Sequence, residues 1–317
     1  MTMNIKFQTL KVVAVFMMAT TLLVFTGCKS QQKAVSSIEA PQPTLINEDA
    51  KVWAKVHTTE LIQKYMATAD NKIDPDEMRL LFKPIGYDGG SNTVYYRDAE
   101  RYLVDTLYSV MLERAVRQGK TEFVIFTGPS ASGKSTAARE MDFSNTGLVY
   151  DAAFNSYKKL AGAIQKAQRY GMKNIRLIAV YNTIRNCFKN SVDRGKKSGR
   201  FIHIPYMIES FGNNVHKMEL MKQNFPNIEY YCFDKRDNVV AKRVSIDEAC
   251  QWDFHVTQDD ITYLLNVLRD EIDKGDLTKH QLAYIAGDLL SIEGLSDSNR
   301  ALAQEINSRI RALAGQD

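Results

Sequence analysis

The residues with the clearest chemistry lie in the segment 121–136, which reads TEFVIFTGPSASGKST. It has the Walker A spacing, in which a glycine is followed after four residues by Gly-Lys-Ser. Gly128 and Gly133 let backbone N–H groups turn around phosphate oxygens, and a helix that starts near Lys134 points the positive end of its dipole at them. The Lys134 ammonium would pair with the β- and γ-phosphates, and the Ser135 hydroxyl would ligate Mg²⁺. The segment therefore predicts a site for ATP or GTP with Mg²⁺.

The context of this motif favours a phosphate site over the alternative, a chance turn rich in glycine and serine. The apolar run 123–126 predicts a strand directly before the motif, and residues 135–141 predict a helix directly after it. A strand, a glycine-rich loop and a helix are the context in which this motif binds phosphate. The predicted nucleotide-binding residues are Gly128, Pro129, Ser130, Ala131, Ser132, Gly133, Lys134, Ser135 and Thr136.

Asp151 follows a second apolar run, 148–150, and so lies at the carboxyl end of a predicted strand. Ligands of open α/β sheets bind at this edge, and an acid placed there commonly holds the water shell of Mg²⁺. The alternative role is an N-cap for the next helix, for which Asn155 and Ser156 are also candidates. We therefore predict Ser135 and Asp151 as the magnesium residues.

A strongly basic segment, 183–197, predicts a helix that ends near a Gly-Arg pair. Its cations are Arg185, Lys189, Arg194, Lys196 and Lys197. Phosphoryl transfer spreads negative charge over the γ-phosphate oxygens, and guanidinium groups of a closing lid can stabilise that charge because their fork geometry matches phosphate. A basic helix that only faces solvent is the alternative, and spacing alone does not distinguish the two.

The order of these segments resembles the zeta-toxin-like P-loop kinases over residues 121–238, from GPSASGKST through DRGKKSGRFIHIPYMIESF to FDKRDN. The resemblance implies a P-loop NTPase fold and transfer of the γ-phosphoryl group to a hydroxyl of a small-molecule acceptor, such as a nucleotide sugar. It also implies that Arg194 and Arg200 are lid arginines. With Lys134 and Asp151 they form the predicted catalytic set.

One element of that family is missing between the Walker A loop and Asp151. The stretch 142–150 is too short for the extra strand and the Asp-x-Asp-like element that supplies the catalytic base in those kinases. Asp142 is the candidate substitute, although no motif surrounds it.

The elements that must position these residues predict an α/β fold. A strand at 148–150, a helix at 156–170 with Gly171 as its stop signal, and a strand at 175–181 follow one another. This alternation is typical of a parallel sheet wound with crossover helices. The sequence therefore predicts a P-loop type of parallel sheet flanked by helices.

The first 27 residues form a predicted targeting segment. Lys6 and Lys11 precede the apolar stretch 12–27, which is shorter than a membrane-spanning helix and stops at Cys28. The arrangement resembles a bacterial lipobox, which implies lipid on Cys28 and a membrane anchor on the non-cytoplasmic side of the cell envelope. An uncleaved anchor is the alternative and gives the same side. Export and the missing acidic element together motivate an alternative function, a lipid-anchored nucleotide-binding or interaction protein without catalysis.

Helical patterns lie on both sides of the predicted sheet in the sequence. Upstream, residues 47–118 have helical spacing, and Asp74-Pro75-Asp76 indicates a helix start. Downstream, the segments 259–274, 277–287 and 296–313 predict three further helices. The predicted organisation is a lipoprotein signal peptide at 1–27, a tether at 28–50, a P-loop kinase domain with N-terminal helices at 51–240 and a helical appendage at 241–317.

The net charge and the cysteine content limit the classes of partner and of metal site that the sequence predicts. The chain of 317 residues has a formal charge of +4, of which Lys6 and Lys11 in the targeting segment contribute two. The remainder is too balanced to predict a nucleic-acid partner. Cys187, Cys232 and Cys250 are widely spaced and odd in number, which favours buried free thiols over disulfides or a metal site. The predicted partners are a nucleotide, a small-molecule acceptor and, through Cys28, a membrane.

Overall fold

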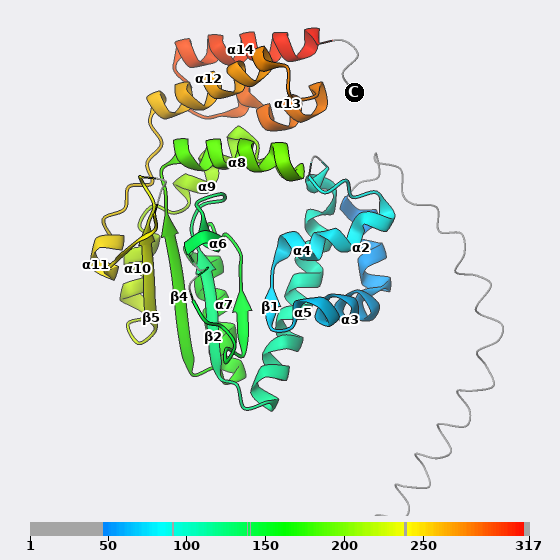
Figure 1. Ribbon diagram of the computed structural model, residues 1–317, viewed down its shortest axis with the longest axis vertical. Coiled ribbons are helices and arrows are strands. Elements are labelled where there is room, and N and C mark those ends of the chain that lie inside the picture. The colour runs from blue at the N-terminus through cyan, green and yellow to red at the C-terminus, as the bar shows by residue number, and fades with distance from the viewer. Residues whose placement is uncertain (1–46, 91, 138, 140, 238–239, 314–317) are drawn as a thin grey trace, which may run out of the picture. The chain divides into compact units, whose positions relative to one another are not determined.

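A six-stranded, mostly parallel sheet forms the centre of the protein, which is described by a computed structural model over residues 47–90, 92–137, 139, 141–237 and 240–313. The strand order is β1-β3-β2-β4-β5-β6, in which β1 to β5 are parallel and β6 is antiparallel to β5 (Figure 1). The strands are β1 (Lys72–Ile73), β2 (Glu122–Thr127), β3 (Leu148–Tyr150), β4 (Asn174–Tyr181), β5 (Glu229–Asp234) and β6 (Lys242–Val244). The predicted α/β class with a parallel sheet is confirmed.

Helices precede, connect and follow these strands. The first are α2 (Asn47–Val56), α3 (Thr58–Ala69), α4 (Pro75–Arg79) and α5 (Arg97–Arg117), with the 3₁₀ helices η1 (Leu80–Ile85) and η2 (Thr93–Tyr96). The next are α6 (Lys134–Ala137), α7 (Tyr157–Tyr170), α8 (Ile184–Ser198), α9 (Ile204–Gly212), α10 (Lys217–Asn224) and α11 (Ile246–Ala249). The last are α12 (Gln258–Lys274), α13 (Lys279–Ala286), η3 (Leu289–Ser291) and α14 (Asp297–Ala312). In the part of the chain that is described, no helix has the length and apolar character needed to cross a membrane.

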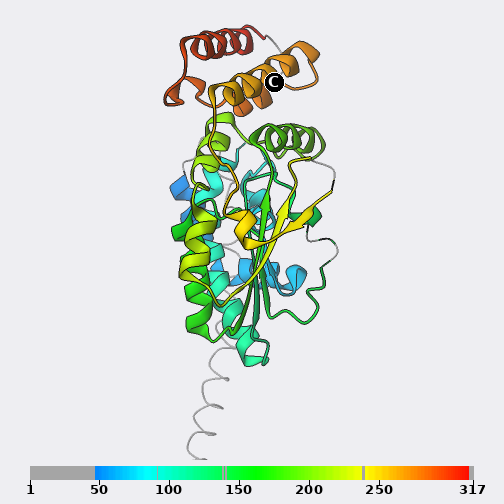
Figure 2. The ribbon, with the colours of Figure 1, turned by 90° about the vertical axis from the view of Figure 1, so that its left-hand side faces the viewer.

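Both faces of the sheet are buried, which explains why the run 123–126 is apolar throughout. Phe123 and Ile125 belong to the apolar cluster that includes α5 and α7. Val124 and Phe126 point to the opposite face and pack with Ala137 of α6. Figure 2 views the sheet nearly edge-on, with long helices along one of its faces.

The helices before β2 are part of this core. Leu103 and Leu107 of α5 are fully buried and belong to the same cluster as Phe123. The ring centres of Tyr108 and Phe123 are 5.9 Å apart. The helix before the Walker A strand therefore packs on the sheet.

The helix α12 packs against α8, α13 packs against α9 and α12, and α14 packs on α12 and α13. Phe188 and Val192 of α8 share a second apolar cluster with Leu264 of α12 and Ile306 of α14. Figure 1 shows these helices beyond α8 as seen from the sheet. All three segments that were predicted to be helical downstream of the sheet are helical. The segment 241–317 also contributes the last strand, β6.

The strand β1 was not expected within the upstream helical region. Ile73 is fully buried and pairs with Tyr150 of β3, and the N–H of Asp151 donates to the carbonyl oxygen of Ile73 at 2.8 Å. The predicted helix start is confirmed, since Asp74 caps α4. A strand of two residues has no apolar alternation that a sequence could reveal, so only the pairing with β3 identifies it.

Candidate functional site

The Walker A segment leaves β2 at Thr127 and turns tightly before α6 begins at Lys134. Gly128 and Gly133 have φ angles of +131° and +93°, a region that glycine adopts readily and other residues do not. A Cβ on Gly128 would lie 2.2 Å from the carbonyl oxygen of Val180, so β4 passes too close for any side chain. The fold therefore requires the same glycines that the motif requires.

Lys134 is half-buried in this loop, and Ser132 is buried. Lys134 Nζ donates to the carbonyl oxygens of Gly128 at 3.4 Å and Pro129 at 3.0 Å. Burial lowers the pKa of Lys134, and the charge of Asp151 acts in the opposite direction. Ser132 is fully buried, and its hydroxyl has no hydrogen-bond partner within the described residues. Ser132 does not line the cleft that Ser130, Ala131 and the residues 133–136 line.

Asp151 lies at the carboxyl end of β3, and its side chain is 14% exposed. Burial raises the pKa of Asp151, while Lys134 and Lys72 oppose that shift. Lys72 Nζ lies 3.4 Å from Asp151 Oδ2. The N-cap of α7 is Ser156, whose hydroxyl accepts from the N–H of Lys159. The alternative role of Asp151 as that cap is therefore wrong.

The donor set suits magnesium that arrives with a phosphate ligand. Ser135 and Asp151 line the same cleft. Across the described ranges, no group of three or more His, Cys, Asp or Glu side chains is placed to hold a metal ion by itself. Proteins usually bind Mg²⁺ through one or two side-chain oxygens together with phosphate oxygens and waters. A hydroxyl and a carboxylate fit that pattern.

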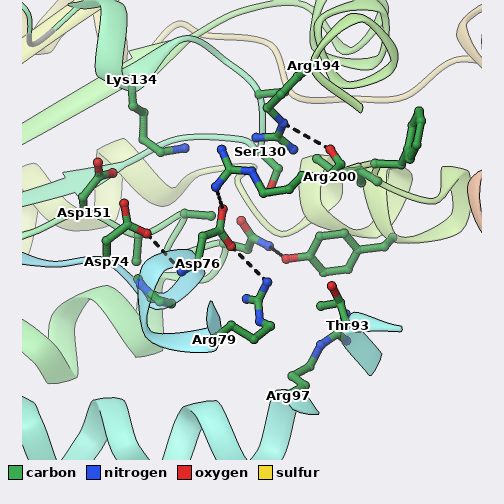
Figure 3. A pocket seen from close by; sticks show the side chains of 18 of the residues that line it. Asp74, Asp76, Arg79, Thr93, Arg97, Ser130, Lys134, Asp151, Arg194 and Arg200 are labelled. Atoms are coloured by element: carbon green, nitrogen blue, oxygen red, sulfur yellow. Dashed lines mark hydrogen bonds and ion pairs between the residues drawn. The ribbon is translucent and has the colours of Figure 1, made fainter. Parts of the chain in front are cut away.

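The two predicted lid arginines lie at the same cleft. Arg194 is on α8, and Arg200 follows Gly199, the left-handed C-cap of that helix. Arg194 Nε donates to the carbonyl oxygen of Arg200 at 3.2 Å, and Arg200 Nη1 lies 3.2 Å from Asp76 Oδ2 (Figure 3). Both arginines line the cleft that Lys134 lines. Burial and the charge of Arg200 lower the pKa of Arg194.

The other cations of α8 have different surroundings. Arg185 Nε donates to Asp260 at 2.6 Å, and Lys196 Nζ lies 2.5 Å from Glu271 Oε2, which ties α8 to α12. Lys189 is exposed. The basic helix thus divides its charges between the cleft, the neighbouring helix and solvent, and the alternative of a purely solvated helix does not describe it.

Asp74 and Asp76, for which only a helix start was predicted, also line the cleft. Asp74 directly follows β1, and its carboxylate accepts from the N–H of Asp76 at 3.0 Å. Because β1 is parallel to β3, this Asp-Pro-Asp segment lies at the same sheet edge as Asp151 (Figure 3). The signal was present in the sequence as an Asp-x-Asp pattern, but it precedes the Walker A loop instead of following it.

Asp142 is wrong as the substitute for that acidic element. It is exposed, and its carboxylate accepts from the N–H of Ser144 at 2.8 Å within a turn. It does not line the cleft that Asp151 lines. The described residues between α6 and β3 contain no strand, in agreement with the length of that segment.

A chain of ion pairs holds Asp76 in place. Arg79 Nη1 lies 3.1 Å from Asp76 Oδ1, and Arg79 Nη2 lies 2.6 Å from Glu100 Oε2. Glu100 is buried on α5, and burial raises its pKa although Arg79 opposes the shift. The ion-pair chain Glu100–Arg79–Asp76–Arg200 therefore connects α5 to the segment that follows α8.

Aromatic and polar side chains from distant segments complete the cleft, whose volume is about 800 Å³. Asn155 Nδ2 donates to the Tyr206 hydroxyl at 2.8 Å, and the Arg97 guanidinium lies 5.5 Å from the centre of the Tyr206 ring. The ring of Tyr284, on α13, lies 6.0 Å from the ring of His203. The helices predicted as an appendage thus supply part of the wall, which no spacing in the sequence indicated.

No protein-family model matches the chain, and no curated protein sequence matches it significantly. The assignment of a function consequently rests on the residues of this cleft and on the motifs that they form.

Proposed function

We propose that this protein is an ATP- or GTP-dependent phosphotransferase, with a mechanism like that of the zeta-toxin-like P-loop kinases that its motifs resemble. One observation carries the proposal. The Walker A loop, Asp151, two arginines and the Asp74-Pro75-Asp76 segment come from separate parts of the chain and line one cleft. Phosphoryl transfer requires a phosphate cradle, cations for the transferred group and an acid for the acceptor, and each has a candidate here.

Lys134 and the loop amides would hold the phosphates of the nucleotide in the ground state. Ser135 and Asp151 would hold Mg²⁺, which when bound neutralises charge on the phosphate oxygens. Arg194 and Arg200 would act on the charge that develops on the transferred phosphoryl group.

Asp76 is the proposed residue for the acceptor. Its carboxylate lies beside Arg200 and would orient the acceptor hydroxyl and take its proton. The acceptor oxygen then forms a bond to the γ-phosphorus as the bond from that phosphorus to the β,γ-bridging oxygen breaks, and the nucleoside diphosphate leaves. A cleft of about 800 Å³ suits a small-molecule acceptor of nucleotide-sugar size.

The alternative, a lipid-anchored nucleotide-binding or interaction protein without catalysis, was motivated by predicted export and by the missing acidic element. Asp74 and Asp76 can fill the role of that acidic element from upstream of the Walker A loop. The missing element is therefore a weaker reason to propose a protein without catalysis. The test is consumption of ATP and GTP by full-length protein with and without candidate sugar-nucleotide acceptors. Acceptor-dependent consumption with a phosphorylated product is the expected result. Tight nucleotide binding without consumption for any acceptor would favour the non-catalytic alternative.

The proposed location is the non-cytoplasmic side of a bacterial cell envelope, with a lipid anchor on Cys28. This residue lies outside the described part of the chain, and the proposal depends on the lipobox-like pattern alone. Acyl chains contribute about 0.8 kcal/mol per buried methylene to membrane binding. Metabolic labelling with a fatty acid should therefore mark the wild type and not Cys28→Ser, and label that persists in the variant would exclude lipidation at this position.

A further inference from the structure

Lys235 is a buried lysine to which the proposed mechanism gives no role. It directly follows β5, and its N–H donates to the carbonyl oxygen of Tyr181 at the end of β4. The residue is 6% exposed and lines the same cleft as the Walker A loop. Within the described ranges its ammonium has no hydrogen bond and no ion pair. The adjacent acid, Asp234, is paired instead with Arg236 at 2.6 Å.

The side chain of Lys235 lies directly against the Walker A loop. Its Nζ is 2.7 Å, and its Cδ 3.1 Å, from the position that a Cβ on Gly133 would occupy. Any side chain at residue 133 would therefore displace the lysine. Lys134 and Lys235 also act on the same buried thiol, Cys187, since both charges oppose the burial that raises the pKa of Cys187 to about 12. The loop is thus flanked by two lysines.

The stem of Lys235 is buried, whereas its ammonium borders the cleft and has no partner among the described residues. Such a group is expected where a ligand supplies the missing partner. An anion in the Walker A loop would supply it, since Lys235 Nζ already lies beside the backbone of that loop.

We propose that Lys235 is a second phosphate-binding lysine of the nucleotide site and contacts the phosphates nearer to the nucleoside. This inference rests on the proposed function. In the sheet, β3 with Asp151 lies on one side of β2, and β4 and β5 lie on the other. With Mg²⁺ and the terminal phosphate on the Asp151 side, the phosphate beside Lys235 is one that a nucleoside diphosphate retains.

The test is titration of the full-length protein in detergent with Mg-ATP, Mg-ADP and magnesium tripolyphosphate. Lys235→Met keeps the apolar stem and removes the ammonium. Lys242→Ala is the control, because Lys242 is an exposed lysine on β6 outside the cleft. We expect Lys235→Met to lower the affinities for ATP and ADP by a similar factor, roughly 10- to 100-fold, as for the loss of one hydrogen bond to a charged group. Lys242→Ala should leave both affinities unchanged.

The melting temperature of the ligand-free protein provides a second readout. Because Lys235→Met keeps the buried stem and removes an ammonium that has no partner among the described residues, the temperature should stay the same or rise while affinity falls. A purely structural lysine would lower both, and that result would overturn the inference.

The three ligands separate failure of this inference from failure of the proposed function. Nucleotide binding by the wild type with unchanged affinities in Lys235→Met would overturn the role of Lys235 alone. Binding of tripolyphosphate but not of nucleotides, with a loss in Lys235→Met, would support the lysine and overturn the nucleotide assignment. A wild type that binds none of the three would overturn both.

Discussion

The two walls of the cleft differ in how the chain builds them. The loop wall is a single segment, 127–136, whose glycines, lysine and serine are adjacent in sequence. The acid wall consists of Asp74, which directly follows β1, Asp76 and Arg79 on α4, and Glu100 on α5. A contiguous segment carries its geometry in its own backbone torsions, so its chemistry is visible in sequence. A wall assembled by strand pairing and helix packing depends on the whole fold.

The two walls should also differ in function. The loop wall should determine whether nucleotide binds. The acid wall and the arginine joined to it should determine how fast phosphate is transferred, with little effect on nucleotide affinity. Variants of each wall can therefore separate nucleotide affinity from the rate of phosphate transfer.

The largest expected effect is on turnover in Arg200→Ala and Arg194→Ala. A lost arginine of this kind lowers the rate on the order of 1,000-fold, because its charge is needed where the transferred phosphoryl group becomes more negative. Nucleotide affinity should change far less, since Lys134 and the loop hold the ground state. Lys189→Ala is the matched control, as an exposed cation on the same helix. Steady-state rates and nucleotide titrations of the wild type and the variants measure the two effects. Parallel losses of rate and affinity would contradict a role of these arginines in transfer alone.

The next effect concerns Asp76→Asn, which keeps the shape of the side chain and removes its charge. Turnover should fall on the order of 100-fold, as for loss of a general base. Asp70→Asn is the control, because Asp70 is exposed and has a left-handed φ of +43° that asparagine tolerates. Since Asp76 pairs with Arg200, the double variant with Arg200→Ala should lose less than the product of the two single losses. Full turnover in Asp76→Asn would show that Asp76 does not act as the general base.

A smaller effect is a pH dependence with opposite signs for stability and for magnesium. Burial raises the pKa of Asp151 above its unfolded value of 3.8. A raised carboxyl pKa gives stability that is fully present below pH 3.8 and is lost as pH rises through the folded pKa. Mg²⁺ requires the ionised form, so affinity for Mg-nucleotide should fall, by at most about tenfold per pH unit, as pH drops below the raised pKa.

Asp151→Asn isolates this contribution, because Glu100 and Glu77 also have raised pKa values caused by burial. Denaturant unfolding from pH 4 to 7 should show that the gain in stability on acidification is smaller in the variant than in the wild type. Identical pH profiles would show that Asp151 does not titrate in this way.

Much of the fold was predictable because its signals are local. The runs at 148–150 and 175–181 and the stop at Gly171 gave the central strands and the helix between them, and the Walker A spacing placed Lys134. The acid wall was not predictable for a physical reason. Its strand, β1, is two residues long, and its position beside Asp151 depends on a pairing across more than 70 residues of chain.

The same reason applies to two residues that line the cleft outside these two walls. Tyr284 reaches the cleft because α13 packs on α9 and α12, and Lys235 lies against Gly133 because β5 follows β4 in the sheet. Neither residue stands in a motif with the Walker A loop. Tertiary packing alone brings them there, so only a structure assigns them.

The central claim is that the loop wall holds nucleotide phosphates, and calorimetric titration of the full-length protein with Mg-ATP and Mg-GTP tests it most directly. We expect saturable binding of one nucleotide per chain by the wild type. In Lys134→Ala, binding should be lost while the unfolding transition is unchanged, because the substitution deletes the cation that lies over the loop and little packing. Equal affinity in the wild type and Lys134→Ala would contradict the account.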